Sequence, residues 1–269
     1  MRSTLRADPA VPLEAPAEND PLYVRAAGRA LAVLSAFHHV DGPLSLSEIA
    51  KRAGIDRSAA QRIVHTLKVS GYLRRGPNNR GYLPGLRLLD HTLDVLRLDP
   101  LVQRATPVLL ELRKTVRERV DLSLFDETRL VYAFRMQSKR ETFYATLVGQ
   151  SVPIFCTAGG RAILAALPDE RVVDILRRSE LTAYTPNTIT NPDTIIEQVR
   201  DARRNGFATV RGEFLQGEVA VGVCILGRDG LPLGAIHVGG SLAEWSLEEF
   251  VEKIAPLCIE ASQAISNSL

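Results

Sequence analysis

Cysteine is scarce in this chain, with three residues among 269. The three lie far apart, no two form a CxxC pair, and no histidine stands at the spacing that zinc sites use. This scarcity excludes a small disulfide-stapled domain and predicts no bound metal ion. Each cysteine has apolar neighbours, so we expect small buried side chains in a reducing compartment, without redox or ligand roles, at Cys156, Cys224 and Cys258.

Long apolar runs are also missing, since no segment approaches the ~20 residues that a membrane helix needs. Residues 1–21 lack the apolar centre of a secretory signal and are rich in proline, alanine and acids, which predicts a disordered tail. We therefore expect a cytoplasmic protein without a membrane partner.

Motifs for catalysis and cofactor binding are absent as well. The sequence has no G-x-S-x-G, no P-loop and no dinucleotide fingerprint, and the Gly159-Gly160 pair alone is a weak signal for a nucleotide. We expect no cofactor and no enzyme activity. A hydrophobic content of 45% with 24% charged residues is typical of a globular protein, and the length suffices for one small and one large domain.

Positive charge is concentrated in one block, although the net charge of the whole chain is only +2. Residues 22–83 hold ten lysines and arginines against three acids, a local charge of +7. The tail before this block carries −2 and the remainder of the chain carries −3. A local cluster of cations is what affinity for DNA requires.

The basic block begins with two predicted helices. Apolar residues at helical spacing predict a first helix over residues 29–40. Ser45 and Glu48 then have the S-x-x-E spacing of a capping box, which predicts a second, short helix ending near Ala53.

A third helix follows a short turn. Gly54 tolerates the left-handed conformation of a turn, Ile55 is placed to fill the corner between helices, and Asp56 is a candidate N-cap for residues 57–70. Apolar residues fall on one side of this helix. The polar and cationic residues on the other side are those that a recognition helix presents to base edges and phosphates in the major groove: Arg57, Ser58, Ala59, Gln61, Arg62 and His65.

Residues 72–83 predict two short strands around a turn rich in glycine, proline and asparagine. This pattern is typical of a wing, and its candidate DNA contacts are Arg74, Arg75 and Arg80. Helix pairs of this kind also occur in protein-binding modules. The order of capped helix, glycine turn, cationic helix and arginine-bearing wing, together with the local charge, favours DNA.

The amino-terminal segments RALAVLSAF, LSLSEIAKRAGIDRSAAQRIVHTLKVSGYLRR and GYLPGLRLLD resemble the IclR family of bacterial transcriptional regulators. GQSVPIFCTAGGRAILAALPDE, YTPNTITNPD and residues 199–240 resemble the effector-binding domain of the same family, with some features of the subgroup that controls aromatic-acid catabolism. The resemblance covers about residues 22–266. It implies a winged helix-turn-helix domain, a linker helix and an α+β, GAF-like effector-binding domain, assembled as a homodimer or a dimer of dimers.

The predicted domains are therefore a winged helix at 22–83, a linker helix at 84–100 and an effector-binding domain at 101–269. The linker is amphipathic and carries a leucine stripe that its small neighbouring domain offers little surface to cover. We expect a homodimer contact there, with packing on its own domain as the alternative. The stripe consists of Leu86, Leu89, Leu93 and Leu96.

The carboxy-terminal region alternates between helical and strand-like patterns, as expected of an α+β domain. The predicted helices are 101–116, 160–166, 169–177, 194–205 and 247–266. The predicted strands are VDLSLFD, RLVYAF, 207–211, 219–226 and 233–238.

The candidate ligand site lies where Thr157-Ala158-Gly159-Gly160-Arg161 opens a helix, since exposed amides at a helix start suit a carboxylate. Tight packing of glycine against a strand explains the same residues equally well. The resemblance implies that the effector pocket lies between this helix start and the inner face of the sheet. It places pocket positions at Ala158, Gly159, Val210, Ala220, His237 and Gly239.

Several of these positions depart from the pattern of better-known family members. Those proteins often carry an acid near Val210, a cysteine near Ala220 and serines near His237 and Gly239. The departures argue against a glyoxylate-like or pyruvate-like effector. Small side chains predict room for a larger ligand, and His237 with Arg211 is expected to meet an anion, so an aromatic carboxylate is the leading candidate.

Two other functions stay open at this point. Cys156 or Cys224 meeting His237 in space would allow nucleophilic catalysis in an enzyme with a fused DNA-binding module. A winged helix without affinity for DNA would indicate a protein-interaction adaptor. The sequence favours a regulator that binds double-stranded operator DNA as a dimer or tetramer and senses a small organic acid.

Overall fold

The computed structural model describes residues 20–137 and 148–269. The chain divides into two compact units, with the division between Val95 and Leu96. The smaller unit contains the basic block and the larger unit contains the α+β region. The predicted tail at 1–21 lies almost wholly outside the described residues.

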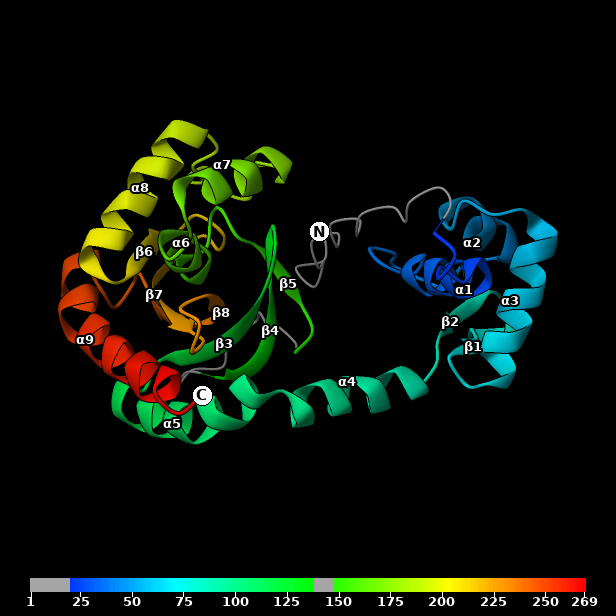
Figure 1. Ribbon diagram of the computed structural model, residues 1–269, viewed down its shortest axis with the longest axis horizontal. Helices are drawn as coiled ribbons and strands as arrows, with labels where there is room; N and C mark the ends of the chain where they lie inside the picture. The colour runs from blue at the N-terminus through cyan, green and yellow to red at the C-terminus, as the bar shows by residue number, and fades with distance from the viewer. Residues whose placement is uncertain (1–19, 138–147) are drawn as a thin grey trace. The chain divides into compact units, whose positions relative to one another are not determined.

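The smaller unit has the elements of a winged helix in the predicted order (Figure 1). Its helices pack around a core that includes Val33, Ile49, Val64 and Leu73. The two strands pair antiparallel, and Leu44 adds a bridge to Tyr82. The elements are α1 (Arg25–Ser35), α2 (Leu46–Arg52), α3 (Arg57–Val69), β1 (Leu73–Arg75), the 3-10 turn η1 (Pro77–Asn79) and β2 (Tyr82–Pro84).

The local signals that predicted α2 and α3 are confirmed. The Ser45 hydroxyl accepts from the amide of Glu48 at 3.3 Å, and the Glu48 carboxylate accepts from the amide of Ser45 at 2.8 Å. Gly54 has a φ of +64° in the turn, and Asp56 accepts from the amide of Ala59 at 2.8 Å. These bonds satisfy amides that no helical carbonyl reaches.

The predicted first helix at 29–40 is wrong in its bounds, because α1 spans Arg25–Ser35. A side chain that is distant in sequence binds carbonyl groups just beyond the end of the helix. Arg52 donates to the carbonyl of Ala36 at 2.6 Å and to that of His38 at 2.7 Å, which satisfies acceptors beyond the helix end. His39 then has a φ of 58°, a left-handed conformation that ends the helical path.

Helix α4 (Arg87–Leu98) corresponds to the predicted linker and has no buried residue. Leu86, Leu89 and Leu93 are 72%, 64% and 63% exposed. Leu96, the fourth leucine of the predicted stripe, instead packs against the core of the larger unit. Three of the four stripe leucines are therefore uncovered in the single chain.

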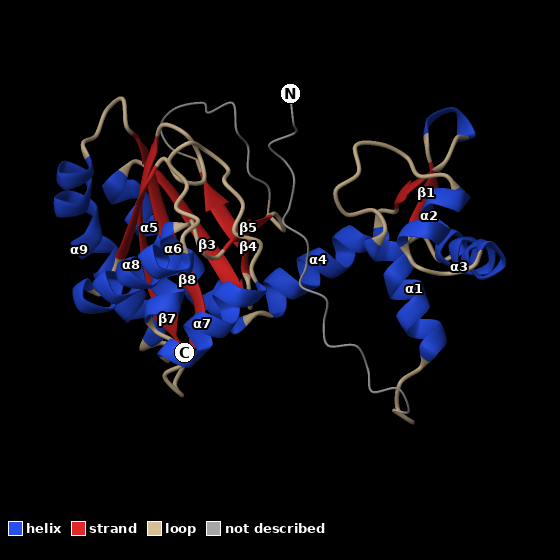
Figure 2. Cartoon of the chain, turned by 90° about the horizontal axis from the view of Figure 1, so that it is seen from above, coloured by secondary structure: helices blue, strands red, loops and turns tan. Residues whose placement is uncertain are grey.

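The larger unit contains one six-stranded antiparallel sheet in the order β5-β4-β3-β8-β7-β6, drawn as red strands in Figure 2. The strands are β3 (Arg119–Asp126), β4 (Arg129–Met136), β5 (Ser151–Pro153), β6 (Ala208–Arg211), β7 (Glu218–Leu226) and β8 (Pro232–Ser241). Every predicted strand is present. The three-residue β5 is additional, and it is too short to show an alternating pattern.

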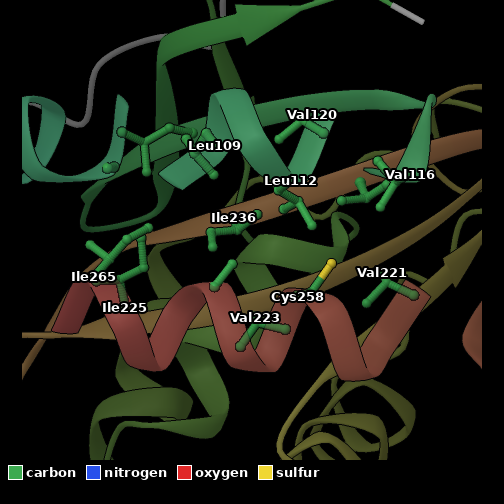
Figure 3. Close-up of a cluster of buried hydrophobic side chains, with 14 of the residues drawn as sticks. Leu109, Leu112, Val116, Val120, Val221, Val223, Ile225, Ile236, Cys258 and Ile265 are labelled. Atoms are coloured by element: carbon green, nitrogen blue, oxygen red, sulfur yellow. The ribbon is translucent and has the colours of Figure 1, made fainter. Parts of the chain in front are cut away.

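Helices cover both faces of this sheet. On one face, α5 (Pro100–Val116) and α9 (Leu247–Ser266) enclose a core with the apolar residues of β3, β7 and β8 (Figure 3). On the other face lie α6 (Ala158–Ala165), α7 (Asp169–Arg178) and α8 (Pro192–Asn205). Because side chains alternate along a strand, every second residue of β3, β7 and β8 faces α6.

No helix in the described parts of the chain is long and apolar enough to cross a membrane. The same residues contain no cluster of three histidine, cysteine or acidic side chains able to hold a metal ion.

Candidate functional site

The exposed face of α3 carries the predicted DNA-reading side chains. Its apolar face is buried, with Ala60 and Val64 at 0% and 1% exposure. Asp56 caps the helix start, so the first two turns are fixed while their outward side chains remain in solvent. The exposed polar residues are Arg57, Ser58, Gln61, Arg62 and His65.

Ala59 is a correction to this set. Its side chain is only 5% exposed, so it is not available to a thymine methyl. Helix α3 packs against α1 and α2, and Ala59 is one of its buried residues. The domain itself encloses this side chain.

The wing presents its three arginines in different ways. Arg74 donates through Nε to the carbonyl of Pro84 at 3.2 Å, and the guanidinium carbon of Arg75 lies 4.4 Å from the centre of the Tyr82 ring. Arg80 follows the 3-10 turn at the wing tip. All three are exposed, so the wing is a cationic surface whose strand arginines are held in place.

The structure brings the six predicted effector positions together. In the antiparallel register, Val210 pairs with Ala220, and Ala220 pairs with Gly239. Ala158, at the first turn of α6, packs on Val210 and Ala220 in a small buried cluster. His237 and Gly159 lie against each other beside this cluster, because a Cβ at Gly159 would fall on the His237 ring.

His237 occupies a buried position between α6 and the sheet. Its Nε2 lies 2.6 Å from the Ser123 hydroxyl, and its ring meets the Tyr132 ring edge-on with centroids 5.6 Å apart. Burial lowers the pKa of His237 to about 4; the Asp121 carboxylate opposes this shift, and the guanidinium groups of Arg119 and Arg135 add to it. The imidazole is therefore neutral at pH 7.

A network of charged side chains lies beside His237. Arg119 donates to Asp121 at 2.8 Å and to Glu218, and Arg135 lies 3.5 Å from the other oxygen of Asp121. Burial acts to lower the pKa of Arg119, yet Glu218 and Asp121 outweigh it and leave that pKa above its usual range. The network thus contains two basic and two acidic side chains.

The small residues at Gly159 and Gly239 do not leave open space, which corrects the prediction of room for a larger ligand. The His237 ring fills the position of a Cβ at Gly159. At Gly239, a Cβ would lie 2.5 Å from both an Arg119 nitrogen and a Glu218 oxygen. At these two positions the space is filled by the protein's own polar side chains.

The expected pairing of His237 with Arg211 is also wrong. Val210 faces α6, and neighbouring residues of a strand point to opposite faces, so Arg211 points away from His237. Arg211 instead borders a hollow of about 370 Å³ together with Trp245 and Ser246. Arg119 and Arg135 are the arginines near the imidazole.

Sequence reasoning missed the polar residues that β3, β4 and β7 bring to this site. One available signal was the alternation in VDLSLFD, where Asp121 and Ser123 recur at every second position. Pairing across the sheet depends on contacts distant in sequence, which no local pattern contains. The missed residues are Arg119, Asp121, Ser123, Tyr132, Arg135 and Glu218.

The start of α6 is fixed by two further interactions. Thr157 caps the helix by accepting from the amide of Gly160 at 3.3 Å. Arg161 is 1% exposed and donates through both terminal nitrogens to Glu213, at 2.6 and 2.5 Å. Arg161 thereby ties the helix to the loop after β6.

The cysteines behave as buried apolar groups. Cys156 and Cys258 are fully buried, and burial raises the pKa of Cys224 and of Cys258 to about 12. A nucleophilic thiol needs a lowered pKa. The ring nitrogen of His237 is engaged by Ser123, so the geometry gives no support to a Cys-His catalytic pair.

Two family models together match most of the chain. The model described as "Bacterial transcriptional regulator IclR C-terminal" matches residues 93–267, and "IclR helix-turn-helix domain" matches residues 26–77. Among curated proteins, the Pca regulon regulatory protein of Pseudomonas putida is 28% identical over 251 residues, which cover 93% of this chain and 86% of that protein.

Solved structures show the same fold. The IclR of Thermotoga maritima is 28% identical, with a TM-score of 0.69 and coverage of 92% of this chain and 99% of that one. An IclR homologue from Microbacterium hydrocarbonoxydans, crystallised with 4-hydroxybenzoate, is 23% identical, with a TM-score of 0.74 and coverage of 91% and 98%. With the winged helix, the α+β domain and both family matches in agreement, the chain belongs to the IclR family of bacterial transcriptional regulators.

Proposed function

We propose that this regulator reads operator DNA with α3 and the wing and responds to a small aromatic carboxylate bound beneath α6. The observation that carries the DNA part is the exposed face of α3, where Arg57, Gln61 and Arg62 stand outward from a capped and packed helix. Bidentate arginine and glutamine contacts are the commonest means of reading base edges. The arginines of the wing supply phosphate contacts.

Residues 22–83 are proposed as the DNA-reading domain, 84–100 as the linker and 101–269 as the effector domain. A bacterial regulator with operator DNA as its partner is proposed to act in the cytoplasm. The match to families of transcriptional regulators supports a role in DNA binding rather than in catalysis.

The working form is proposed to be a dimer formed through α4, or a pair of such dimers. Leu86, Leu89 and Leu93 would lose their solvent exposure in such a contact. Two winged helices would then meet successive major grooves of a pseudo-palindromic site.

The effector class is proposed from the site and from two relatives. The site combines a small apolar cluster at Ala158, Val210 and Ala220 with a neutral imidazole, the partly buried Arg119 and the largely buried Arg135. Apolar side chains suit the ring of an aromatic acid, and the imidazole and arginines suit its carboxylate. The regulator crystallised with 4-hydroxybenzoate has the same fold, and the Pca regulon regulator is similar over most of the chain.

A thermal-shift screen of the full-length chain tests the sensing proposal. Benzoate, 4-hydroxybenzoate and protocatechuate should raise the melting temperature in a concentration-dependent way, because a ligand stabilises the state that it binds. Benzyl alcohol and phenol, which lack the carboxylate, serve as controls and should give no shift. A flat response to all the acids would contradict the proposal.

A further inference from the structure

The carboxylate of Glu218 lies on Arg119 directly over Gly239, one of the predicted effector positions. Arg119 reaches this point from β3, where it pairs in register with Gly239 of the neighbouring strand β8. Glu218 reaches it from the beginning of β7. A side-chain carboxylate of the protein therefore occupies the place where the carboxylate of an acid effector is expected.

The balance of charges in this arrangement limits how an anionic ligand can bind. Two arginines and two acids share the site, and the nearby His237 is neutral at pH 7. An anionic ligand entering beside all four would add an uncompensated negative charge to a buried environment, which is strongly unfavourable. Binding becomes favourable if the carboxylate of Asp121 or Glu218 leaves the site as the carboxylate of the ligand enters.

Of the two acids, Glu218 is the one whose side chain can reach solvent. Its side chain is 14% exposed, whereas that of Asp121 is 0% exposed. The backbone of Glu218 is held by pairing with Ser241 and by its carbonyl, which accepts from the amide of Gly212 at 2.7 Å. Only rotation of the side chain is needed to move its carboxylate into solvent.

Arg135 provides a second reason to expect a ligand here. Its side chain is 4% exposed, yet within residues 20–137 and 148–269 its Nε has no hydrogen-bond partner, and neither has the Oδ1 of Asp121. A buried guanidinium that lacks a hydrogen bond gains most from an additional acceptor. The network is balanced in charge but incomplete in hydrogen bonds.

We propose that Glu218 is an internal competitor for the effector: its carboxylate holds Arg119 in the ligand-free protein and is displaced by the carboxylate of an aromatic acid. This inference rests on the proposed sensing function and adds a residue that sets affinity. Glu218 would keep the site closed against neutral molecules, because only an anion can replace it on Arg119.

Isothermal titration of 4-hydroxybenzoate and benzoate into the full-length chain tests the proposal. Glu218→Gln keeps the size of the side chain but removes the competing charge, so it should tighten binding at least fivefold. The paired change Arg119→Met with Glu218→Gln removes one charge of each sign, leaves Asp121 its ion pair with Arg135, and should weaken binding at least tenfold relative to Glu218→Gln. Glu218→Asp, with a shorter reach to Arg119, should give an intermediate gain and replaces Glu218→Gln if that variant does not fold.

The matched control is Glu213→Gln, which alters a different arginine-glutamate pair, with Arg161, in the same domain. It should lower the melting temperature without tightening binding. Unchanged or weaker binding in Glu218→Gln, while the wild type binds, would overturn this inference and leave the sensing proposal intact. Equal tightening in Glu213→Gln would also overturn it. Absence of binding to every variant would overturn both proposals.

Discussion

The hydroxyl oxygen of Ser123 lies 2.6 Å from Nε2 of His237, in a buried site beneath the first turn of α6. Burial, with a smaller effect from Arg119 and Arg135, keeps the imidazole neutral, with its pKa lowered to about 4 from an ordinary value of 6.5. The unfolded chain takes up a proton on this histidine below pH 6.5, while the folded chain does not.

The free energy of unfolding should therefore decrease as the pH falls from about 6.5 to about 4, with a contribution from His237 of up to about 3 kcal/mol. Above pH 6.5 this contribution is constant. Urea denaturation followed by the fluorescence of Trp245, the single tryptophan, reports on the larger unit. His237→Gln should remove this part of the pH dependence, and a wild-type slope retained in the variant would contradict the assignment.

The His237 ring leaves no space for a Cβ at residue 159, so this position requires glycine. Gly159→Ala places a methyl group on the imidazole, and forcing a methyl into a packed site costs about 1–3 kcal/mol. His237→Ala in the same chain creates space for that methyl. The double variant should be clearly less destabilised than the sum of the two single variants. Additive losses, measured by urea denaturation, would show that the two residues do not meet.

The buried pair of Arg161 and Glu213 should hold the start of α6. Arg161→Met leaves the Glu213 carboxylate buried without its partner, a change that costs about 3–5 kcal/mol. Combining it with Glu213→Leu removes the orphaned charge and should recover at least half of the loss. No recovery in the double variant would indicate that the bond from Arg161 to the carbonyl of Phe155 matters more than the ion pair.

Arg62 and Arg80 should affect DNA binding in different ways. Arg62→Ala should cost about 1–3 kcal/mol on a preferred sequence and little on random DNA, as expected for a bidentate base contact. Arg80→Ala should weaken binding to all sequences and reduce the salt slope by about 1. Arg228→Ala, an exposed cation in the turn between β7 and β8, is the control and should leave both values unchanged. Gel-shift titrations at several salt concentrations distinguish these outcomes.

The exposed stripe of α4 should mediate dimerisation. Leu93→Lys places a charge in the proposed contact and should shift the chain toward monomer in analytical ultracentrifugation. Val95→Lys adds the same charge on the opposite side of the helix, at an exposed position off the stripe, and should preserve the dimer. A dimer that survives Leu93→Lys would place the contact elsewhere.

Local chemistry predicted most of the fold. The Ser45-Glu48 capping box, the turn at Gly54 and the cap at Asp56 depend on neighbours in sequence, and each is present as predicted. The end of α1 was mispredicted because it depends on Arg52, which lies 14 and 16 residues beyond the carbonyls that it caps. Ala59 was misplaced because a small residue gives no signal of which neighbour encloses it.

The residues proposed to bind the effector were predicted only in part. Family resemblance located Ala158, Gly159 and His237, which the fold brings together. The charges around them come from β3, β4 and β7, and the Arg119-Glu218 contact joins residues 99 positions apart. Only the strand order of the sheet reveals that these side chains share one face.

The central claim is that binding of an aromatic acid changes the affinity of this chain for DNA. The most direct test selects a preferred DNA sequence from a random pool with the full-length protein, then measures affinity for it by fluorescence anisotropy with and without 4-hydroxybenzoate. We predict a preferred pseudo-palindromic sequence and a change in affinity of at least fivefold with the acid, absent in the Arg119→Met, Glu218→Gln variant. Failure to select any sequence, or equal affinity with and without benzoate, 4-hydroxybenzoate and protocatechuate, would contradict it.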